Sequence, residues 1–347
     1  MVELLKQIIA GEDLTAEQAT RAMTAIMSGQ AGEIQTAGFL TALALKGETG
    51  VEIEAFSRAM RKAAVSWPRR VGDTLLDTCG TGGDSSGIIN ISTLSALVVA
   101  SLGVKVAKHG NRAVSSPTGS ADVLEELGIS MSLQPEEVAD CLEKVGMCFL
   151  FAPTWHPAMK FAAPVRKALG VRTVFNLLGP ITNPAPVTHQ VIGVFDGRFL
   201  EPLGDALAGL GRKGACVLHS RDGLDELSIA APTDYILIRE GRIEKKGQFR
   251  PDDFGIQNQE IASLKVADRK ESARRVQAIL EGKGSEAENA MVGANAALAH
   301  HLIFPDSELK SSYEICRETM KAGRPMEVLE KWRSFHNSST SVTSVGG

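Results

Sequence analysis

The sequence is poor in the residues that mark several protein classes. Only 5% of its 347 residues are aromatic, which leaves few rings for stacking on nucleic-acid bases. Its five cysteines form no CxxC pair and are odd in number. This pattern fits free thiols in a reducing compartment better than a disulfide or zinc framework.

The chain also lacks an excess of positive charge and any long apolar run. Its net charge of -4 argues against a nucleic-acid coat and against binding to an acidic lipid surface. No apolar run reaches the roughly 20 residues needed to cross a bilayer. The amphipathic, acid-containing start, MVELLKQIIAGEDL, does not have the pattern of a signal peptide. We therefore expect a cytoplasmic protein with neither a nucleic-acid nor a membrane partner.

A helical pattern occupies the beginning of the chain. Apolar residues recur at helical spacing through residues 1–68, and Thr15 with Gln18 forms a capping-box pattern. Four such helices without strands predict a small helical domain. The chain is longer than one hydrophobic core usually serves, so a second domain is expected to follow.

The pattern changes from residue 74. Residues 74–79, 104–109, 147–152, 189–194 and 214–219 are short, nearly all apolar and mostly separated by helical stretches. Strands buried on both faces and alternating with helices predict a parallel sheet. Residues 234–246 predict a hairpin at a sheet edge that turns at Glu240-Gly241. The expected fold class is α/β: a small all-helical lobe plus a large lobe with a mainly parallel β-sheet flanked by helices.

Two further stretches set the expected domain boundaries. The large domain is expected to cover residues 74–335, and the polar, low-complexity residues 336–347 are expected to form a disordered tail. Residues from about 160 to 182 interrupt the α/β alternation and carry helical spacing. We expect them to return to the helical lobe, which would place Arg166 in the cleft between the lobes.

The glycine-rich stretch CGTGGD follows the first predicted strand and precedes a helix that starts near Asn90. Free backbone N–H groups and a helix N-terminus together form an anion site, typically for phosphate. A tight strand-to-helix turn explains the glycines equally well. The stretch lacks the GK[ST] ending of a Walker loop and the spacing of a dinucleotide site.

Three more polar clusters follow predicted strands or neighbour them. The run from Lys108 to Arg112, with Ser115, Ser116 and Thr118 behind it, suits a charged phosphate or carboxylate ligand. Asp222, Asp225 and Glu226 offer oxygen ligands of the kind that Mg²⁺ prefers. Arg166, with His156, Lys167 and Arg172 nearby, offers a guanidinium for a planar carboxylate. Taken singly, each cluster is also explained by solvated surface charge.

The motifs DTCGTGGD, NIST, KHGNRAVSS, VRKALGVRTVFNLLGPITNP and DGLDE occur in this order behind the helical lobe. In this arrangement residues 1–335 resemble the anthranilate phosphoribosyltransferase family. The resemblance implies transfer of a phosphoribosyl group from phosphoribosyl pyrophosphate (PRPP) to the amine of anthranilate, in tryptophan biosynthesis. It also implies a homodimer formed through the helical lobe.

The resemblance further implies a set of site residues. Mg²⁺, two ions per site, would be bound by Ser92, Asp225 and Glu226. Anthranilate would contact Gly80, His109, Asn111 and Arg166. PRPP would contact Gly80, Thr81, Gly83, Asp84, Asn90, Ile91, Ser92, Thr93, Lys108, His109, Gly110, Asn111, Arg112, Ala113, Val114, Ser115, Ser116 and Ser120.

One departure from the family pattern and two rival functions accompany this interpretation. Ile88-Ile89 stands where the family commonly has threonine and phenylalanine, so a hydroxyl contact to phosphate is missing and weaker donor binding is expected.

An aryl amine attacks in its neutral form, so we expect no dedicated catalytic base. The rivals are a pyrimidine nucleoside phosphorylase-like enzyme and a non-catalytic nucleic-acid-binding paralogue.

Overall fold

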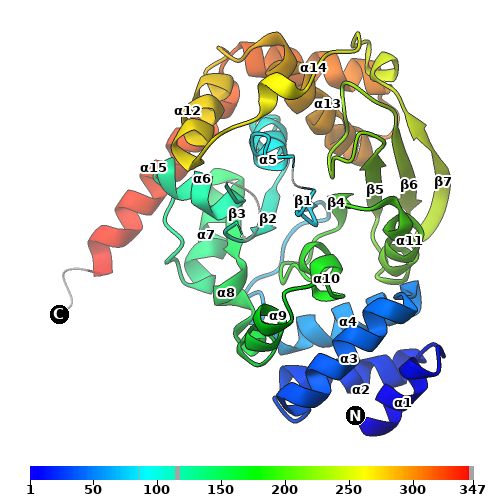
Figure 1. Ribbon diagram of the computed structural model, residues 1–347. Coiled ribbons are helices and arrows are strands. Elements are labelled where there is room, and N and C mark those ends of the chain that lie inside the picture. The colour runs from blue at the N-terminus through cyan, green and yellow to red at the C-terminus, as the bar shows by residue number, and fades with distance from the viewer. Residues whose placement is uncertain (85, 114–117, 344–347) are drawn as a thin grey trace.

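Figure 1 presents the computed structural model, which describes residues 1–84, 86–113 and 118–343, with side chains to residue 338. The N-terminal helices lie together at one end of the molecule, and the sheet lies above them with its covering helices. The N-terminal helices are α1 (Val2–Ile9), α2 (Ala16–Met27), α3 (Gly32–Lys46) and α4 (Gly50–Ala63).

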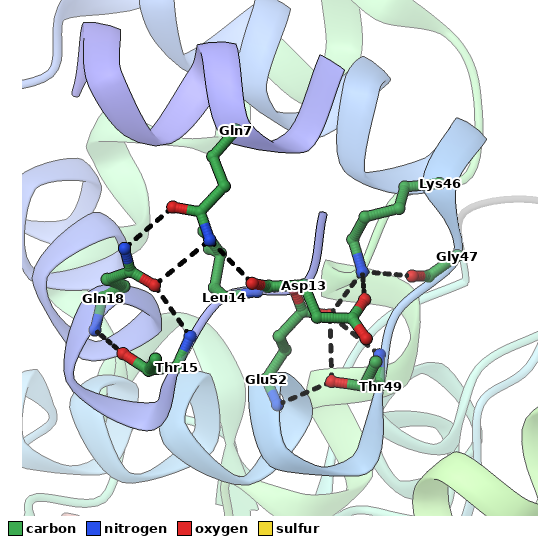
Figure 2. Close-up of polar contacts among 9 residues, drawn as sticks. All are labelled: Gln7, Asp13, Leu14, Thr15, Gln18, Lys46, Gly47, Thr49 and Glu52. Carbon is green, nitrogen blue, oxygen red and sulfur yellow. Dashed lines mark hydrogen bonds and ion pairs between the residues drawn. The ribbon is translucent and has the colours of Figure 1, made fainter. Parts of the chain in front are cut away.

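Capping boxes fix the starts of two of these helices, α2 and α4 (Figure 2). The predicted capping box at Thr15 and Gln18 is present and begins α2. A second box begins α4, and its fully buried Glu52 also accepts hydrogen bonds from Lys46 at 3.0 Å and from the N–H of Leu14 at 2.9 Å. A buried carboxylate is stable only when its oxygens are paired. Glu52 therefore ties the α1–α2 connection to the α3–α4 connection.

A single sheet of seven strands forms the centre of the large lobe, in the order β3-β2-β1-β4-β5-β6-β7. The first five strands of the chain are parallel, and β6 and β7 are antiparallel additions. The bounds are β1 (Leu76–Gly80), β2 (Val106–Gly110), β3 (Met147–Phe151), β4 (His189–Gly193), β5 (Gly214–Ser220), β6 (Thr233–Arg239) and β7 (Arg242–Phe249). All five predicted strands are confirmed, and so is the hairpin, in which Glu240 and Gly241 have φ of 47° and 70°.

The remaining helices lie before, between and after the strands. Before β4 the structure contains α5 (Ile91–Ser101), α6 (Ser120–Glu126), α7 (Pro135–Val145), α8 (Ala152–Trp155), α9 (Ala163–Leu169) and α10 (Phe175–Ile181). After β4 follow α11 (Leu200–Gly209), α12 (Arg269–Leu280), α13 (Glu286–Ile303), α14 (Leu309–Lys321) and α15 (Arg324–Thr343). Short 3₁₀ turns occur at Pro157–Phe161, Gly197–Phe199, Pro251–Phe254 and Ala262–Leu264.

Two hydrophobic cores lie on opposite faces of the sheet. One core lies between the sheet and α5, α13 and α15. The other joins apolar side chains of the helical lobe to α11 and to Ile192, Val217 and Ile236 on the opposite sheet face. The helices α4 and α11 approach closely, since a Cβ at Gly50 would lie 2.5 Å from that of Asp205. The helical lobe therefore packs firmly on one face of the sheet.

The segment from α9 to α10 lies beside the helical lobe (Figure 1). Helix α9 contacts α3, and α10 contacts α4. Their apolar side chains, including Val165 and Phe175, belong to the same core as the helical lobe. Between these two helices, Arg172 lies close enough to the strand ends to contact Gly83.

The C-terminal segment differs from its prediction. Residues 336–343 were expected to be disordered, but α15 continues through them to Thr343. The helix is anchored by Trp332, which is fully buried, and by His336, which is 4% exposed. The polar composition of residues 336–347 did not indicate a helix, because the buried apolar side chain of Trp332 lies just before this stretch. Residues 344–347 lie outside the described part of the chain.

Two expectations from the composition can be compared with the structure. All five cysteines are free thiols, and four of them are buried. No helix within the described residues is long and apolar enough to cross a membrane.

Candidate active site at the carboxyl ends of the parallel strands

The predicted polar clusters meet where the chain order of the sheet changes direction. Strand β1 is flanked by β2 on one side and by β4 on the other. In open α/β sheets, ligands bind beyond the carboxyl ends of the strands at such a switch point. The glycine-rich loop lies here, and Gly82 and Gly83 have φ of 63° and 80°, a region that favours glycine.

Asp225 approaches this backbone so closely that side chains are excluded. A Cβ at Gly80 would overlap Asp225 Oδ2, and a Cβ at Gly193 would overlap the Asp225 carbonyl oxygen. The Asp225 carboxylate accepts a hydrogen bond from the N–H of Gly82 at 2.7 Å. Contact with Asp225 is therefore by itself a reason for glycine at these positions. Gly193 was not predicted, since only the pairing of β1 with β4 makes it a neighbour of Gly80.

Three carboxylates share this end of the sheet. Burial and the nearby charge of Asp84 raise the pKa of Asp225 to about 7. Burial and the charge of Asp225 raise the pKa of Glu226 as well. Glu226 accepts a hydrogen bond from the N–H of Ser92 at 3.1 Å, at the start of α5. Crowded carboxylates of this kind gain from a cation between them.

The oxygen atoms at this site fit Mg²⁺ if a bound phosphate completes the coordination shell. Within the described residues, no three His, Cys, Asp or Glu side chains are grouped closely enough to bind a metal ion by themselves. Mg²⁺ is commonly bound through one or two carboxylates together with phosphate oxygens and water. The oxygen atoms of Asp225, Glu226 and Ser92 are therefore a suitable partial shell.

Lys108 brings a buried positive charge to the same place. Its side chain is only 1% exposed, and its ammonium donates to the Thr78 carbonyl at 2.5 Å and to Ser92 Oγ at 3.1 Å. Burial lowers the pKa of Lys108, whereas the charges of Asp77 and Glu226 oppose this shift. Lys108 thus connects the ends of β1 and β2 with the first turn of α5.

A buried polar network that was not predicted supports the end of β2. The Asp77 carboxylate is fully buried and accepts hydrogen bonds from the N–H of His109 at 3.2 Å and from Asn183 Nδ2 at 2.9 Å. Asn183 also donates to the Ala107 carbonyl at 2.8 Å. Because a buried carboxylate needs such partners, Asp77 fixes the position of the segment that carries Lys108 and His109.

Two buried histidines lie next to each other at this end of the sheet. Their rings are 5.1 Å apart between centroids, and burial lowers the pKa of His109 to about 3 and that of His156 to about 4. His109 Nδ1 lies 3.0 Å from the Gly179 carbonyl, which can only accept, so Nδ1 carries the proton. Both rings are therefore neutral at physiological pH.

Arg166 lies over the ring of Phe175, with its guanidinium carbon 5.3 Å from the ring centroid. Burial lowers the pKa of Arg166. Among the side chains that the structure describes, in residues 1–84, 86–113 and 118–338, no acidic group forms an ion pair with it. A partly buried guanidinium that lacks an acidic partner in this region suits a carboxylate ligand.

Some predicted site residues have other partners in the structure. Arg112 forms an ion pair with Glu125 and lies over the Phe151 ring. Asn90 accepts a hydrogen bond from Ser272 at 3.0 Å. The assignment of Arg112 and Asn90 to the donor site remains a prediction.

The other predicted residues occupy the loops and helix starts around them. Ile91 and Thr93 are buried in the first turn of α5, and Asn111 is exposed. Thr81 Oγ1 accepts from the N–H of Phe195 at 3.0 Å, and the Ala113 N–H donates to Asp122 at 2.9 Å. Gly110 and Ser120 are adjacent, since a Cβ on Gly110 would overlap Ser120 Oγ. Val114, Ser115 and Ser116 lie outside the described residues.

Ile88 and Asp222 also have structural partners. Ile88 pairs with Lys265 in an isolated antiparallel bridge, and its half-buried side chain packs on the larger core. Asp222 is exposed and accepts a hydrogen bond from Ser228 Oγ at 2.6 Å. Asp222 therefore supports the turn that carries Asp225, whereas the expected loss of donor affinity at Ile88 stays a prediction.

Comparison with known proteins agrees with this arrangement. Residues 2–64 match the helical bundle domain of the glycosyl transferase family, and residues 72–326 match its a/b domain. The chain is 44% identical over 335 residues to the anthranilate phosphoribosyltransferase of Thioalkalivibrio sulfidiphilus, with coverage of 96% of this chain and 98% of that protein. The corresponding enzyme of Symbiobacterium thermophilum is also 44% identical, with coverage of 96% and 97%.

Solved structures show the same similarity. The anthranilate phosphoribosyltransferase of Thermus thermophilus aligns with a TM-score of 0.91 at 40% identity and covers 96% of this chain and 99% of its own. The Saccharomyces cerevisiae enzyme in complex with PRPP and Mg aligns with a TM-score of 0.89 at 25% identity, covering 97% and 98%. The chain belongs to the anthranilate phosphoribosyltransferase family.

Proposed function

We propose that the residues gathered at the ends of β1, β2 and β5 carry out the reaction of this family. The enzyme transfers the phosphoribosyl group of PRPP to the amine of anthranilate, giving N-(5-phosphoribosyl)anthranilate and pyrophosphate, in tryptophan biosynthesis. The observation that carries the proposal is the convergence of the glycine-rich loop, the buried Lys108 and the Asp225-Glu226 pair at one switch point.

The donor is assigned to the loop and to the start of α5. Backbone N–H groups in the loop and the first turn of α5 offer hydrogen bonds to phosphate oxygens. Lys108 supplies a positive charge that its buried position keeps in place. These groups stabilise the negative charge that develops on the departing pyrophosphate.

Magnesium is assigned to Ser92, Asp225 and Glu226, with two ions per site. Their oxygen atoms lie around the Gly82 N–H and the first turn of α5. When bound, Mg²⁺ neutralises phosphate charge and makes pyrophosphate a better leaving group. The protein holds Asp225 and Glu226 at the strand ends, beside the proposed position of the PRPP phosphates.

Anthranilate is assigned to the side of the site that faces α9 and α10, with Gly80, Asn111 and His109 near it. Arg166 would pair with the carboxylate of anthranilate and orient its amine towards the anomeric carbon. Correct alignment of two reactants contributes about 7–11 kcal/mol in the best intramolecular models. The neutral aryl amine needs no deprotonation before attack.

The absence of a dedicated base is part of the proposal. His109 is the imidazole among the predicted acceptor residues, and its pKa of about 3 makes it a weak proton acceptor near neutral pH. Its Nδ1 is engaged by the Gly179 carbonyl. His109 is therefore assigned to shaping the acceptor side and not to proton transfer.

We also propose a homodimer formed through the helical lobe, in the cytoplasm. Ile34 and Leu45 on α3 are 90% and 84% exposed, and Ile9 on α1 is 69% exposed. Large exposed apolar side chains on neighbouring helices are typical of an interface. Because α9 and α10 share the core of this lobe, residues from about 160 to 182 are assigned to the same domain.

Loss of anthranilate fluorescence on adding PRPP and Mg²⁺ tests the reaction. The purified chain should consume anthranilate only when both are supplied, and it should not cleave thymidine with phosphate. Thymidine phosphorolysis without anthranilate consumption would favour the nucleoside phosphorylase alternative. A salt-dependent DNA shift without either activity would favour the nucleic-acid-binding alternative.

A further inference from the structure

Arg172 reaches the glycine-rich loop from the segment between α9 and α10. Its guanidinium donates a hydrogen bond to the Gly83 carbonyl. The same guanidinium lies over the Phe195 ring, with 3.9 Å between its central carbon and the ring centroid. Arg172 thus contacts both the loop after β1 and a residue just after β4.

The contact with Gly83 determines how one peptide unit of the loop is oriented. In a planar trans peptide the carbonyl and the N–H point in opposite directions. When the Gly83 carbonyl turns towards Arg172, the N–H of Asp84 turns away from it. Within the described part of the chain no protein acceptor bonds to this N–H, so it is available to a phosphate oxygen.

The loop needs such a restraint because glycine permits the opposite orientation. Gly82 and Gly83 both adopt positive φ, and a glycine pair rotates between conformations at little cost. The other restraints act earlier in the loop: Gly82 donates to Asp225, and Thr81 is bonded to Gly193 and Phe195. Arg172 is the side chain in the described residues that binds the Gly83 carbonyl.

We propose that Arg172 is a positioning residue for the donor. It orients the Gly83–Asp84 peptide so that an N–H group, and not a carbonyl oxygen, faces the phosphates of PRPP. Phe195 supports Arg172 by providing a flat surface for the guanidinium. This inference rests on the proposed function, because it concerns the same donor site.

Steady-state kinetics of R172A, R172K and the control K167A test this role. Lys167 is an exposed charge on α9, and K167A should leave both KM values unchanged. R172A should raise the KM for PRPP about five- to tenfold, as expected for loss of a charged hydrogen bond at an exposed position, and should change the KM for anthranilate less than about twofold. R172K retains the charge but loses the planar guanidinium over Phe195, so its KM for PRPP should be intermediate.

A double-mutant comparison separates positioning from general destabilisation. F195L should raise the KM for PRPP less than R172A does, and R172A/F195L should be no worse than R172A, because the two side chains act as one unit. A KM for PRPP within about twofold of the wild type in R172A, or an equal rise in both KM values, would overturn the inference. Inactive wild-type enzyme would instead overturn the proposed function.

Discussion

Asp225 illustrates how single residues combine two tasks at this site. Its carboxylate lies against Gly80 and accepts a hydrogen bond from the Gly82 N–H, and its backbone carbonyl lies against Gly193. Its pKa of about 7 follows from burial and from the charge of Asp84. The role of Asp225 therefore depends on the strand ends against which it packs.

Arg166→Ala should weaken acceptor binding more than donor binding. The guanidinium is assigned to the anthranilate carboxylate, and a bidentate pair of this kind is among the stronger hydrogen-bonded contacts. We expect the KM for anthranilate to rise at least about tenfold, with a much smaller change for PRPP. Steady-state kinetics with each substrate varied in turn checks this. Equal effects on the two substrates would count against the assignment.

The buried histidines His109 and His156 should each contribute stability that is lost in mild acid. The folded-state pKa values of His109 and His156, about 3 and 4, lie below the ordinary value of 6.5. Each therefore contributes stability that is present above pH 6.5 and is lost as the pH falls towards the folded value. At pH 5 the loss is about 2 kcal/mol for each histidine.

Urea unfolding at pH 7 and pH 5 measures this dependence. His109→Gln should lose up to about 2 kcal/mol less free energy of unfolding between the two pH values than the wild type loses. His301→Gln, a substitution on α13, is the matched control. Identical pH dependence in His109→Gln and the wild type would show that His109 does not titrate as described.

Several site residues could not be identified from sequence because they depend on neighbours in space. Lys108 lies at the end of a predicted strand, Asp225 and Glu226 follow another, and all three carry charges, so their positions could be inferred before the fold was known. Asp77 lies inside an apolar strand, and its contact with Asn183 spans 106 positions of the chain. Its role becomes visible only when β1, β2 and the segment after α10 are placed together.

At the level of elements, the buried strands were predictable and the end of the last helix was not. A continuous apolar run indicates a strand covered on both faces, and the Glu240-Gly241 pair marks a hairpin turn. Helix α15 has its buried residues Leu329 and Trp332 before a run of serine and threonine. Its outer turns have no apolar pattern of their own, so their helical state follows from the anchored turns before them.

Gly193→Ala tests the packing of the Asp225 turn on the ends of β1 and β4. The new Cβ would overlap the Asp225 carbonyl oxygen, so the turn must move. Overpacking of this kind typically costs about 1–3 kcal/mol. Urea unfolding should detect the loss, and the Mg²⁺ concentration for half-maximal rate should rise.

Gly72→Ala is the control for this substitution. A Cβ at Gly72 meets no atom within 4 Å and its φ is not positive, so stability and Mg²⁺ response should stay at wild-type values. If Gly193→Ala were as stable as Gly72→Ala and responded equally to Mg²⁺, the close approach of Asp225 would not be needed for metal binding.

For the whole molecule, the packing of the helical lobe against the sheet positions the proposed donor and acceptor sides of the site. The lobe shares a core with α11 and with one face of the sheet, while α9 and α10 contact its helices. Arg166 and Arg172 belong to this segment, and Lys108, Asp225 and Glu226 belong to the strand ends. The proposed active site therefore draws its residues from both lobes.

Ile34→Glu combined with Leu45→Glu should disrupt the proposed dimer. Both side chains are largely exposed on α3, and burying charges in an apolar interface is costly. Analytical ultracentrifugation should show a dimer for the wild type and a monomer for the double variant. Ile315→Glu, at an exposed apolar position on α14, should remain dimeric. A dimeric double variant would place the interface elsewhere.

The central claim is that the glycine-rich loop and the strand ends around it bind PRPP. A crystal structure obtained with PRPP and Mg²⁺ tests this most directly. We predict electron density for the pyrophosphate within hydrogen-bonding distance of backbone N–H groups between Gly80 and Asp84, with metal density beside Asp225 and Glu226. Well-defined PRPP bound elsewhere, with no density at the loop, would contradict the account.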